Sequence, residues 1–388
     1  MPKQLLIVTC GLMVLVAFLA VPTLRGQPAD NTRPLETIVF EDEKKLQHEV
    51  TGSVLVEADD GLLVVEQDGR LWTVENDRLQ KRTGTMNPFV PLPPAVLGQK
   101  EQATLGAGFD VVVTKHYVVV CNAGKPYGQW CAALFERLYA AFHNYWKQRG
   151  LTLTEPEFPL VAIVFANERE FGAFATKDAG PDVASAKGYF NIATNRMVLY
   201  DLTAIDGRGA GGGSAADISR RLAASPYNVA TVIHEATHQI AFNSGMHLRY
   251  ADNPLWLTEG MAMYFETPDL QSQTGWRTIG ALNRLRHRQF LELLKKRPRD
   301  SLTTLIESDA RLTDPATSGE AYAEAWALSY FLIKTRKTDY AAYLQKLGTK
   351  PRLQWDDKPT RLAEFKSAFG EDLQKFDTEF VRYMQRAK

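Results

Sequence analysis

The chain contains one His-Glu-x-x-His motif, formed by His234, Glu235 and His238. Residues four positions apart lie on the same face of a helix, so the two imidazoles can bind one metal ion. Glu235 lies about 100° away around the helix axis, and its carboxylate can reach a metal-bound water without binding the metal. With only seven histidines in the chain, a chance match is rare. The motif predicts a hydrolytic metal site; the alternative is an amphipathic helix with surface histidines.

The residues around the motif predict one buried helix. Ser225 suits the N-cap, Pro226 the first helical position, and Gly245 a left-handed stop. Packing of the apolar face would hold the histidine side chains in fixed rotamers. Apolar residues recur at helical spacing at Val229, Val232, Ile233, Ala236, Ile240 and Ala241.

A third ligand is expected, because catalytic zinc has three protein ligands and one open position. The best candidate is Glu259, in a second helix predicted over residues 254–266 between Asn253-Pro254 and Pro268. A carboxylate in so apolar a helix is costly unless it is paired or binds a metal. The alternative is a solvated glutamate on a polar face. The apolar neighbours are Trp256, Leu257, Met261 and Phe265.

The two motifs, His-Glu-x-x-His and Leu-Trp-Leu-x-Glu-Gly, resemble those of gluzincin zinc metallopeptidases, especially the aminopeptidase-like peptidase-MA superfamily. The resemblance covers about residues 105–388. It implies Zn²⁺ bound by His234, His238 and Glu259, with Glu235 as the general base.

Other features refine this resemblance. The segment Glu320–Leu328 also resembles a family of secreted bacterial proteins described as a domain of unknown function (DUF1570-type). The thermolysin-like branch has an Asp four residues after the glutamate ligand, where this chain has Met263. Related gluzincins stabilise the oxyanion with a tyrosine from a later helix, which favours Tyr322; Tyr250 and His247 are the other candidates. The alternative for Tyr322 is an aromatic residue of the core.

Zinc-dependent peptide-bond hydrolysis is the function that these residues favour. The metal would activate a water and polarise the carbonyl, and Glu235 would accept the water proton. Two alternatives stay open: a non-catalytic, zinc-stabilised binding or scaffold protein of the cell envelope, and a structural envelope protein whose β module does the binding. A scaffold needs only the ligands, so the intact Glu235 favours catalysis. The Gly-x-Met-Glu-Asn signature of aminopeptidases is absent, which favours endopeptidase action.

Composition is that of an ordinary globular protein: 388 residues, 45% apolar and 23% charged, with a net charge of zero. Nothing indicates a nucleic-acid partner, and the basic cluster at Lys295-Lys296-Arg297 suits a solvated helix end. The expected partner is a peptide or protein substrate. Lys3 and the apolar run from Leu5 to Val21 predict a secretory signal or an uncleaved membrane anchor. The protein is therefore expected in the periplasm, the cell envelope or the medium.

The patterns predict an α+β protein of several units. Residues 1–21 are the signal or anchor, and residues 22–35 are a polar linker. Residues 36–82 form a small antiparallel β module. Residues 105–278 are the zincin-like catalytic domain, with a mixed sheet and the metal helix, and residues 279–388 are all helical.

Within these units, Asp60-Gly61 and Asp68-Gly69 predict hairpin turns in the β module. In the catalytic sheet, Met197–Tyr200 is the expected edge strand, along which an extended substrate would lie; the alternative is an interior strand. The glycine-rich segment 207–214 is expected to be a flexible surface loop. Strands are predicted at 53–57, 62–67, 70–74, 109–113, 117–121, 160–165, 187–191 and 197–202. Further helices are predicted at 130–147, 168–177, 282–296, 301–308, 321–334, 339–347, 361–369 and 373–386.

The three cysteines leave two possibilities open. Cys10 lies in the apolar N-terminal run. Cys121 and Cys131 either form one disulfide in an oxidising compartment or stay as two buried thiols.

Overall fold

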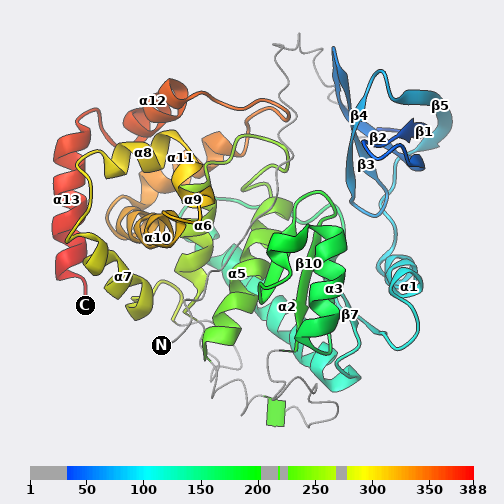
Figure 1. The fold of residues 1–388 in the computed structure, drawn as a ribbon, viewed down its shortest axis with the longest axis horizontal. Helices are drawn as coiled ribbons and strands as arrows, with labels where there is room; N and C mark the ends of the chain where they lie inside the picture. Colours follow the sequence, from blue (N-terminus) through cyan, green and yellow to red (C-terminus); the bar gives the residue numbers. More distant parts are fainter. Residues whose placement is uncertain (1–32, 202–216, 219–225, 268–277) are drawn as a thin grey trace.

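The structure, a computed structural model, is a mixed α+β protein (Figure 1). An N-terminal antiparallel sheet is followed by a mixed sheet and then by a largely helical region. The expected signal or anchor at 1–21, the glycine-rich segment 207–214 and the helix cap Ser225 lie outside the described residues. Among the residues described, no helix combines the length and the apolar character needed to cross a membrane. The described residues are 33–201, 217–218, 226–267 and 278–388.

The N-terminal sheet has five antiparallel strands in the order β4-β3-β2-β1-β5. The turns at Asp60-Gly61 and Asp68-Gly69 separate β2 from β3 and β3 from β4, as expected. The sequence pattern does not reveal β5, because this strand is exposed along almost its whole length and lacks apolar alternation. The strands are β1 Pro34–Glu41, β2 Gln47–Ala58, β3 Gly61–Glu66, β4 Leu71–Glu75 and β5 Leu79–Pro88.

Strand β3 is buried on both faces, which joins the N-terminal sheet to the rest of the chain. One face contributes Leu62 and Val64 to a core that lies within the sheet. The other contributes Leu63 and Val65 to a cluster with Phe158, which lies just before the central-sheet strand at Leu160–Phe165. The N-terminal sheet is therefore packed against the remainder of the protein rather than free of it.

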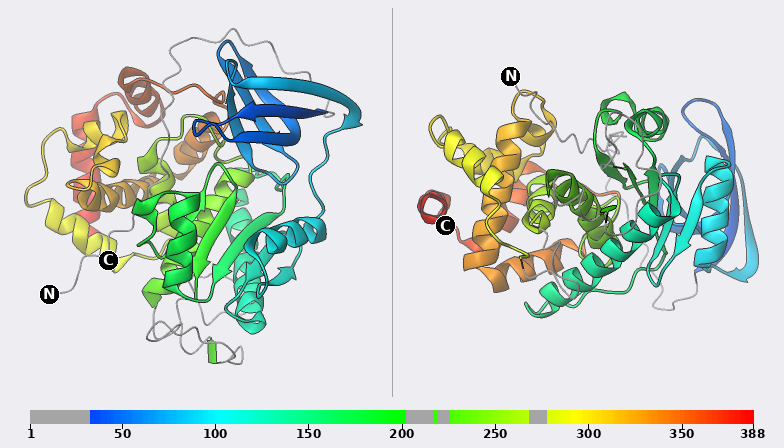
Figure 2. Two further views of the ribbon diagram at one scale, coloured as in Figure 1. Left: turned by 45° about the vertical axis from the view of Figure 1, so that its right-hand side comes forward. Right: turned by 90° about the horizontal axis from the view of Figure 1, so that it is seen from below.

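The central sheet has the order β6-β7-β8-β10-β9. Strands β7 and β8 run parallel, as do β8 and β10, whereas the two outer pairs are antiparallel. β7 and β8 are apolar and buried at every position, as strands covered on both faces must be. Helices lie on both sides of this sheet (Figure 2). The strands are β6 Asp110–Val113, β7 Tyr117–Cys121, β8 Leu160–Phe165, β9 Gly188–Asn191 and β10 Arg196–Tyr200.

The prediction that Met197–Tyr200 is an edge strand is wrong. This segment belongs to β10, which lies inside the sheet between β8 and β9. The edge on this side is β9, Gly188–Asn191. A hairpin pattern identifies two paired strands but not which of them also pairs with a distant parallel strand, and that pairing places β10 inside.

Four helices cover the central sheet. α2 and α5 pack on one face, and α1 and α3 on the other. The prolines before α1 suggest a linker from sequence, but Pro94 occupies the first helical position, where proline is favoured. The helices are α1 Pro94–Leu105, α2 Lys125–Lys147, α3 Glu168–Asp178 and α5 Pro226–Asn243, with a short 3₁₀ helix at Pro181–Val183.

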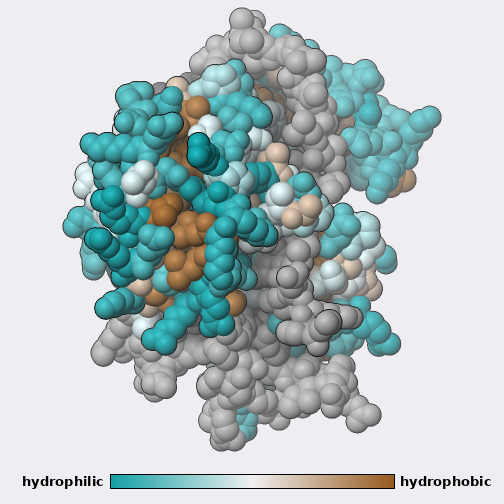
Figure 3. Space-filling view, turned by 60° about the vertical axis from the view of Figure 1, so that its left-hand side comes forward, coloured by the Kyte–Doolittle hydropathy of each residue, from teal (hydrophilic) through white to brown (hydrophobic). Residues whose placement is uncertain are grey.

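The C-terminal region packs around two helices that are buried along almost their whole length, α6 (Leu255–Phe265) and α10 (Ser318–Thr335). The predicted helices agree with the structure to within a few residues. The space-filling view of the outer face of this region shows apolar side chains among hydrophilic ones (Figure 3). The other helices are α7 Arg284–Leu293, α8 Ser301–Glu307, α9 Ala310–Thr313, α11 Lys337–Leu347, α12 Lys358–Phe369 and α13 Leu373–Arg386.

Cys121 and Cys131 are both buried and form no disulfide. Cys121 lies on β7 and Cys131 on α2, within the core between that helix and the sheet. Burial raises the pKa of the Cys121 thiol to about 12, so it stays protonated and unreactive. Of the two possibilities left open by the sequence, the structure has the buried thiols.

Candidate metal centre

Helix α5 presents the His-Glu-x-x-His motif toward α6. The helical period places His234 and His238 one above the other, and both side chains are almost fully buried. The opposite stripe of α5, including Ile233 and Ile240, packs into the main core. Gly245 has a φ of 78°, the left-handed conformation expected just after the helix. The local sequence therefore fixes the spacing of the two imidazoles, and the core fixes their orientation.

Helix α6 brings Glu259 to the two histidines, and Gly260 is what lets α6 come so close to α10. A methyl group at Gly260 would overlap the hydroxyl of Ser329 and the carbonyl oxygen of Ala325. Any larger residue would push the two helices apart and move the neighbouring carboxylate. The Glu-Gly pair of the second motif thus has a packing reason as well as a chemical one.

The three expected ligands lie together. His234 Nε2 is 3.0 Å from His238 Nε2 and 3.1 Å from Glu259 Oε2. His238 Nε2 is 3.4 Å from Glu259 Oε1. All three donor groups lie within 4.8 Å of one another, and among the described residues this is the one such group of His, Cys, Asp and Glu side chains.

This donor set fits a metal ion. Ligands about 2.0–2.1 Å from a tetrahedral zinc are about 3.3 Å from each other, close to the observed spacings. Two imidazole nitrogens that face each other across 3.0 Å, as those of His234 and His238 do, repel unless a proton or a cation lies between them. Two neutral imidazoles and a carboxylate are also ligands that zinc prefers.

Glu266 contacts His234 through Nδ1, the ring nitrogen that does not face the other two candidate ligands. His234 Nδ1 lies 3.0 Å from Glu266 Oε1, so the ring can donate its Nδ1 proton and leave Nε2 free to bind a metal. Asn283 Nδ2 donates to Glu266 Oε2 at 3.0 Å, and Arg286 Nη2 lies 3.4 Å from Oε1. Metal-bound histidines usually have such a carboxylate partner, and its loss weakens metal binding.

Sequence reasoning missed Glu266. The thermolysin-like pattern expects the supporting acid at position 263, which is a methionine here. Glu266 lies directly after the last residue of α6. An acidic residue at a helix C-terminus is disfavoured by the helix dipole, and this one is also buried. The acid at the end of an apolar helix is the signal in the sequence; its burial and its contact with His234 appear only in the structure.

In the metal-free protein a proton takes the place of the cation. Burial alone would lower the pKa of His234, but the hydrogen bonds to Glu259 and Glu266 raise it to about 10. Burial alone would raise the pKa of Glu259, but the neighbouring His238 and His234 lower it below its usual range. The site therefore stabilises one positive charge between these groups, and metal binding would release that proton.

Glu235 is buried beside the triad without a strong partner. Among the described residues neither of its carboxylate oxygens has a hydrogen-bond partner of normal geometry, and its side chain is 1% exposed. Strand β9 runs past it: a methyl group at Gly188 would lie 3.6 Å from Glu235 Cγ, and the amide of Phe190 interacts weakly with the carboxylate. Burial, with smaller contributions from Glu259 and Glu266, raises the pKa of Glu235 to about 8.

The three oxyanion candidates lie in different surroundings. Tyr250 packs with the cluster that joins the N-terminal sheet to the rest of the protein. His247 is fully buried against Phe242, and no described residue forms a hydrogen bond with either of its ring nitrogens. Tyr322 is on α10, the helix that crosses α6 at Gly260, and it is 9% exposed. The assignment of Tyr322 stays a prediction.

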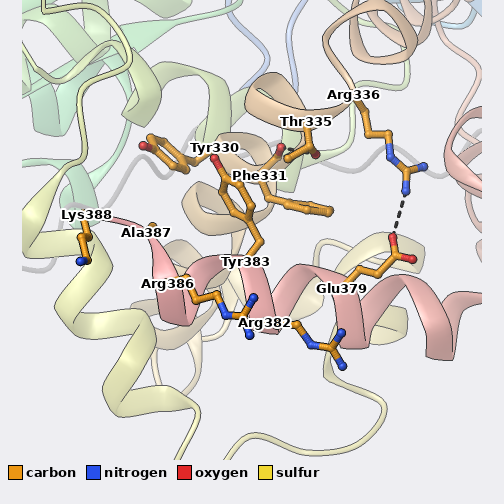
Figure 4. A pocket seen from close by; sticks show the side chains of 10 residues that line it. All are labelled: Tyr330, Phe331, Thr335, Arg336, Glu379, Arg382, Tyr383, Arg386, Ala387 and Lys388. Carbon is orange, nitrogen blue, oxygen red and sulfur yellow. Dashed lines mark hydrogen bonds and ion pairs between the residues drawn. The ribbon is translucent and has the colours of Figure 1, made fainter.

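A separate groove lies between α10 and α13 and encloses about 560 Å³ (Figure 4). Its walls carry aromatic and cationic side chains, including Tyr330, Tyr383 and Arg382. None of the candidate site residues lines it, so the metal centre has to be identified from its donor groups and not from this concave surface.

One family model matches the chain. Residues 228–354, about a third of the sequence, match a family described as a protein of unknown function (DUF1570). The matched segment contains the three candidate ligands together with Glu266 and Tyr322. A search of curated proteins found no match. The comparison thus relates the metal-centre segment to DUF1570 without supplying an activity.

Proposed function

We propose that this protein is a zinc-dependent peptidase of the gluzincin type. The observation that carries the proposal is the convergence of His234, His238 and Glu259 next to a buried carboxylate, Glu235, that makes no strong hydrogen bond. Ligands alone would suit any metal site. An unpaired buried carboxylate costs free energy and is retained where it takes part in chemistry.

The three ligands would hold zinc with one open position, and zinc would lower the pKa of a bound water to roughly 7 and polarise the substrate carbonyl. Glu235 accepts the proton of the attacking water and then donates it to the leaving amine. Burial raises the pKa of Glu235 to about 8 in the metal-free protein, and a cation at the neighbouring ligands would lower it and favour the ionised base. Glu266 keeps His234 in the tautomer whose Nε2 faces the metal.

Extended peptide is the proposed substrate, bound along strand β9. β9 lies at the edge of the central sheet and pairs only with β10 among the described strands. Gly188 and Phe190 of this strand flank Glu235, so a peptide added as a further strand would bring its backbone to the general base. Tyr322 is the proposed oxyanion donor.

The setting of the reaction is part of the proposal. The apolar N-terminal run supports secretion or membrane tethering, and therefore action in the periplasm, the cell envelope or the medium. The partner would be a peptide or protein, and the charge pattern of the sequence does not indicate a nucleic-acid partner.

A zinc-stabilised scaffold is the second candidate, and the burial of the site favours it. The ligands His234 and Glu259 are 1% and 4% exposed. Structural zinc sites are closed in this way, whereas catalytic sites keep one position open to substrate. The peptidase proposal requires the cleft to admit substrate beside β9, and the scaffold proposal leaves Glu235 without a role.

One set of variants separates the two. We expect purified wild type to contain one equivalent of zinc and to cleave casein or a peptide library. Glu235→Gln should keep the zinc and lose at least about a hundred-fold in hydrolysis, because the general base is gone. His238→Ala should lose zinc, and Glu379→Gln, a surface control, should change neither property.

The scaffold predicts a different pattern. Wild type would then bind zinc and cleave nothing, and Glu235→Gln would be indistinguishable from it in metal content and thermal stability. Full hydrolysis by Glu235→Gln would instead show that another group acts as the base.

A further inference from the structure

Two turns that are far apart in the sequence meet beside the metal-centre half of the molecule. One joins β3 to β4 in the N-terminal sheet, and the other joins β9 to β10 in the central sheet. The backbone amide of Leu71 donates to the carbonyl of Ala193 at 2.7 Å, so the two turns share a main-chain hydrogen bond. The views of the fold show the N-terminal sheet next to the central sheet (Figure 2).

Arg249 bridges the same two turns. Its Nη1 donates to the carbonyl of Gly69 at 2.8 Å and to that of Ile192 at 3.2 Å. The guanidinium is buried, and among the described residues no carboxylate forms an ion pair with it. Burial lowers the pKa of Arg249 to about 9. Apart from a through-space attraction to Asp68, the two carbonyl contacts are what compensate for the burial of this cation.

A second arginine reinforces the contact. Arg196, the first residue of β10, donates through Nη1 to the carbonyl of Asp68 at 2.9 Å and through Nε to Glu101 of α1 at 3.2 Å. The Asp68 carboxylate also binds Lys100 Nζ at 2.6 Å. Gly69 closes the turn with a φ of 87°, and a methyl group there would lie 3.1 Å from the ring of Phe158. The β3–β4 turn is thus fitted against its neighbours by charge, hydrogen bonds and shape.

The contact continues from the β9–β10 turn to the metal helix. Asn195 and Asn243 of α5 exchange side-chain hydrogen bonds at 2.9 and 2.7 Å. Gln239, which follows the ligand His238, donates to the carbonyl of Asn195 at 3.1 Å. The strand that enters this turn is β9, which runs past Glu235.

We propose that the N-terminal sheet is a clamp that positions the β9–β10 hairpin against α5. Arg249 and Arg196 are positioning residues: they fix the β9–β10 turn and, through it, the place of β9 relative to Glu235. Under the proposed function this sets how an extended substrate lies at the general base. The N-terminal sheet is then part of the substrate-binding half rather than a separate binding module.

Arg249→Met tests the clamp in the full-length protein. Arginine is replaced without leaving a buried carboxylate unpaired, so the fold is retained, while Gly69 and Ile192 lose their donor. Hydrogen exchange of backbone amides should become at least ten-fold faster in residues 188–200. Arg78→Met is the matched control: Arg78 lies in the same sheet, between β4 and β5, and pairs with the part-exposed Glu75 away from these turns.

Gly69→Ala is a second variant that displaces the turn without changing any charge, and it should accelerate exchange in the same segment. Arg249→Lys, which can still donate to one carbonyl, should restore part of the protection. In the zinc enzyme, Arg249→Met should raise KM several-fold with a smaller change in kcat and with unchanged zinc content, because substrate placement and not the metal is affected.

The outcomes separate the clamp from the peptidase. Faster exchange confined to the hairpin in both clamp variants supports the clamp, even if the wild type hydrolyses no peptide and the proposed function fails. Unchanged exchange in residues 188–200, an equal rise in Arg78→Met, or a rise spread evenly over the whole chain would overturn it. A fall in kcat with loss of zinc would also contradict it.

Discussion

Two fully buried glutamates, on two helices that both pack against α6, have opposite surroundings. Glu324 of α10 is 0% exposed and accepts hydrogen bonds from Arg297 Nε at 2.8 Å, Ser301 Oγ at 2.7 Å and Arg311 Nη2 at 2.9 Å. Glu235 of α5 is 1% exposed, and both of its oxygens lack such a partner within the part of the chain that the structure describes. The protein therefore pairs a buried carboxylate fully where it holds helices together. It leaves one unpaired beside a group that can bind a metal, and that contrast separates structural acids from functional ones.

Removing each acid should give the largest difference. Glu324→Gln should lower the free energy of unfolding by about 3–5 kcal/mol, because Arg311 and Arg297 lose a buried anion. The loss should fall toward the lower end, since Arg297 keeps its pair with Asp377. Glu235→Gln should change it by less than about 1 kcal/mol at pH 7, where a carboxyl with a pKa of about 8 is mostly neutral. Urea denaturation of the metal-free proteins measures both, and equal losses would remove the distinction.

Gly260→Ala should have the next largest effect. The added methyl overlaps α10, and overpacking of this kind costs about 1–3 kcal/mol. Because α6 must shift, zinc affinity should fall as well. Gly319→Ala in α10 is the control, since no described residue lies near its added methyl group and alanine favours a helix there. Thermal unfolding with zinc titration would show the loss for Gly260 alone; a stable, fully zinc-binding Gly260→Ala would contradict the close crossing.

Glu266→Gln sharpens the description of the metal centre. The neutral amide polarises His234 less, so zinc affinity should fall about 10–100-fold. Stability should fall as well, because the buried Arg286 loses its anionic partner. Competition with a chelating dye measures the change. Glu307→Gln, which alters a surface pair with Lys358, should leave zinc affinity unchanged. An unaltered affinity in Glu266→Gln would show that His234 does not need its carboxylate partner.

His247 should make the protein sensitive to mild acid. Its pKa is lowered to about 3 by burial, with a smaller effect of His238, whereas in the unfolded chain it is about 6.5. The unfolded state then binds more protons between these values, so stability is complete above about pH 6.5 and is lost as the pH falls toward 3. At pH 5 the loss is about 2 kcal/mol. His247→Phe should unfold with a flatter pH dependence than wild type; parallel curves would show that His247 is not the group responsible.

Local sequence was sufficient for much of the metal centre. The spacing of His234 and His238 follows from the helical period, and Gly245 marks the helix end by its conformational freedom. Glu259 could be recognised because a carboxylate among apolar neighbours needs a partner. The C-terminal helices were also found, since each carries an apolar face at helical spacing.

The remaining features of the fold and the site depend on long-range packing, so local sequence patterns could not predict them. Glu266 supports His234 across 32 positions of sequence, and no short-range pattern reports that contact. The edge strand of the central sheet is β9 and not the predicted β10, because β10 also pairs with β8, which is distant in the chain. The spacing of Cys121 and Cys131 in the sequence is compatible with either a disulfide or two free thiols. The structure shows two free thiols, buried where α2 packs on the sheet.

The sequence by itself determined which side chains share a helix face, because the helical repeat is set by backbone hydrogen bonds within a few residues. It thereby determined a pair of imidazoles with an acid between them. Only the tertiary structure decided which distant groups meet that pair: Glu259 through the close crossing at Gly260, Glu266 through the end of α6, and β9 through the turn contacts of the N-terminal sheet. These contacts depend on the packing of whole elements, which the pattern of any one segment does not contain.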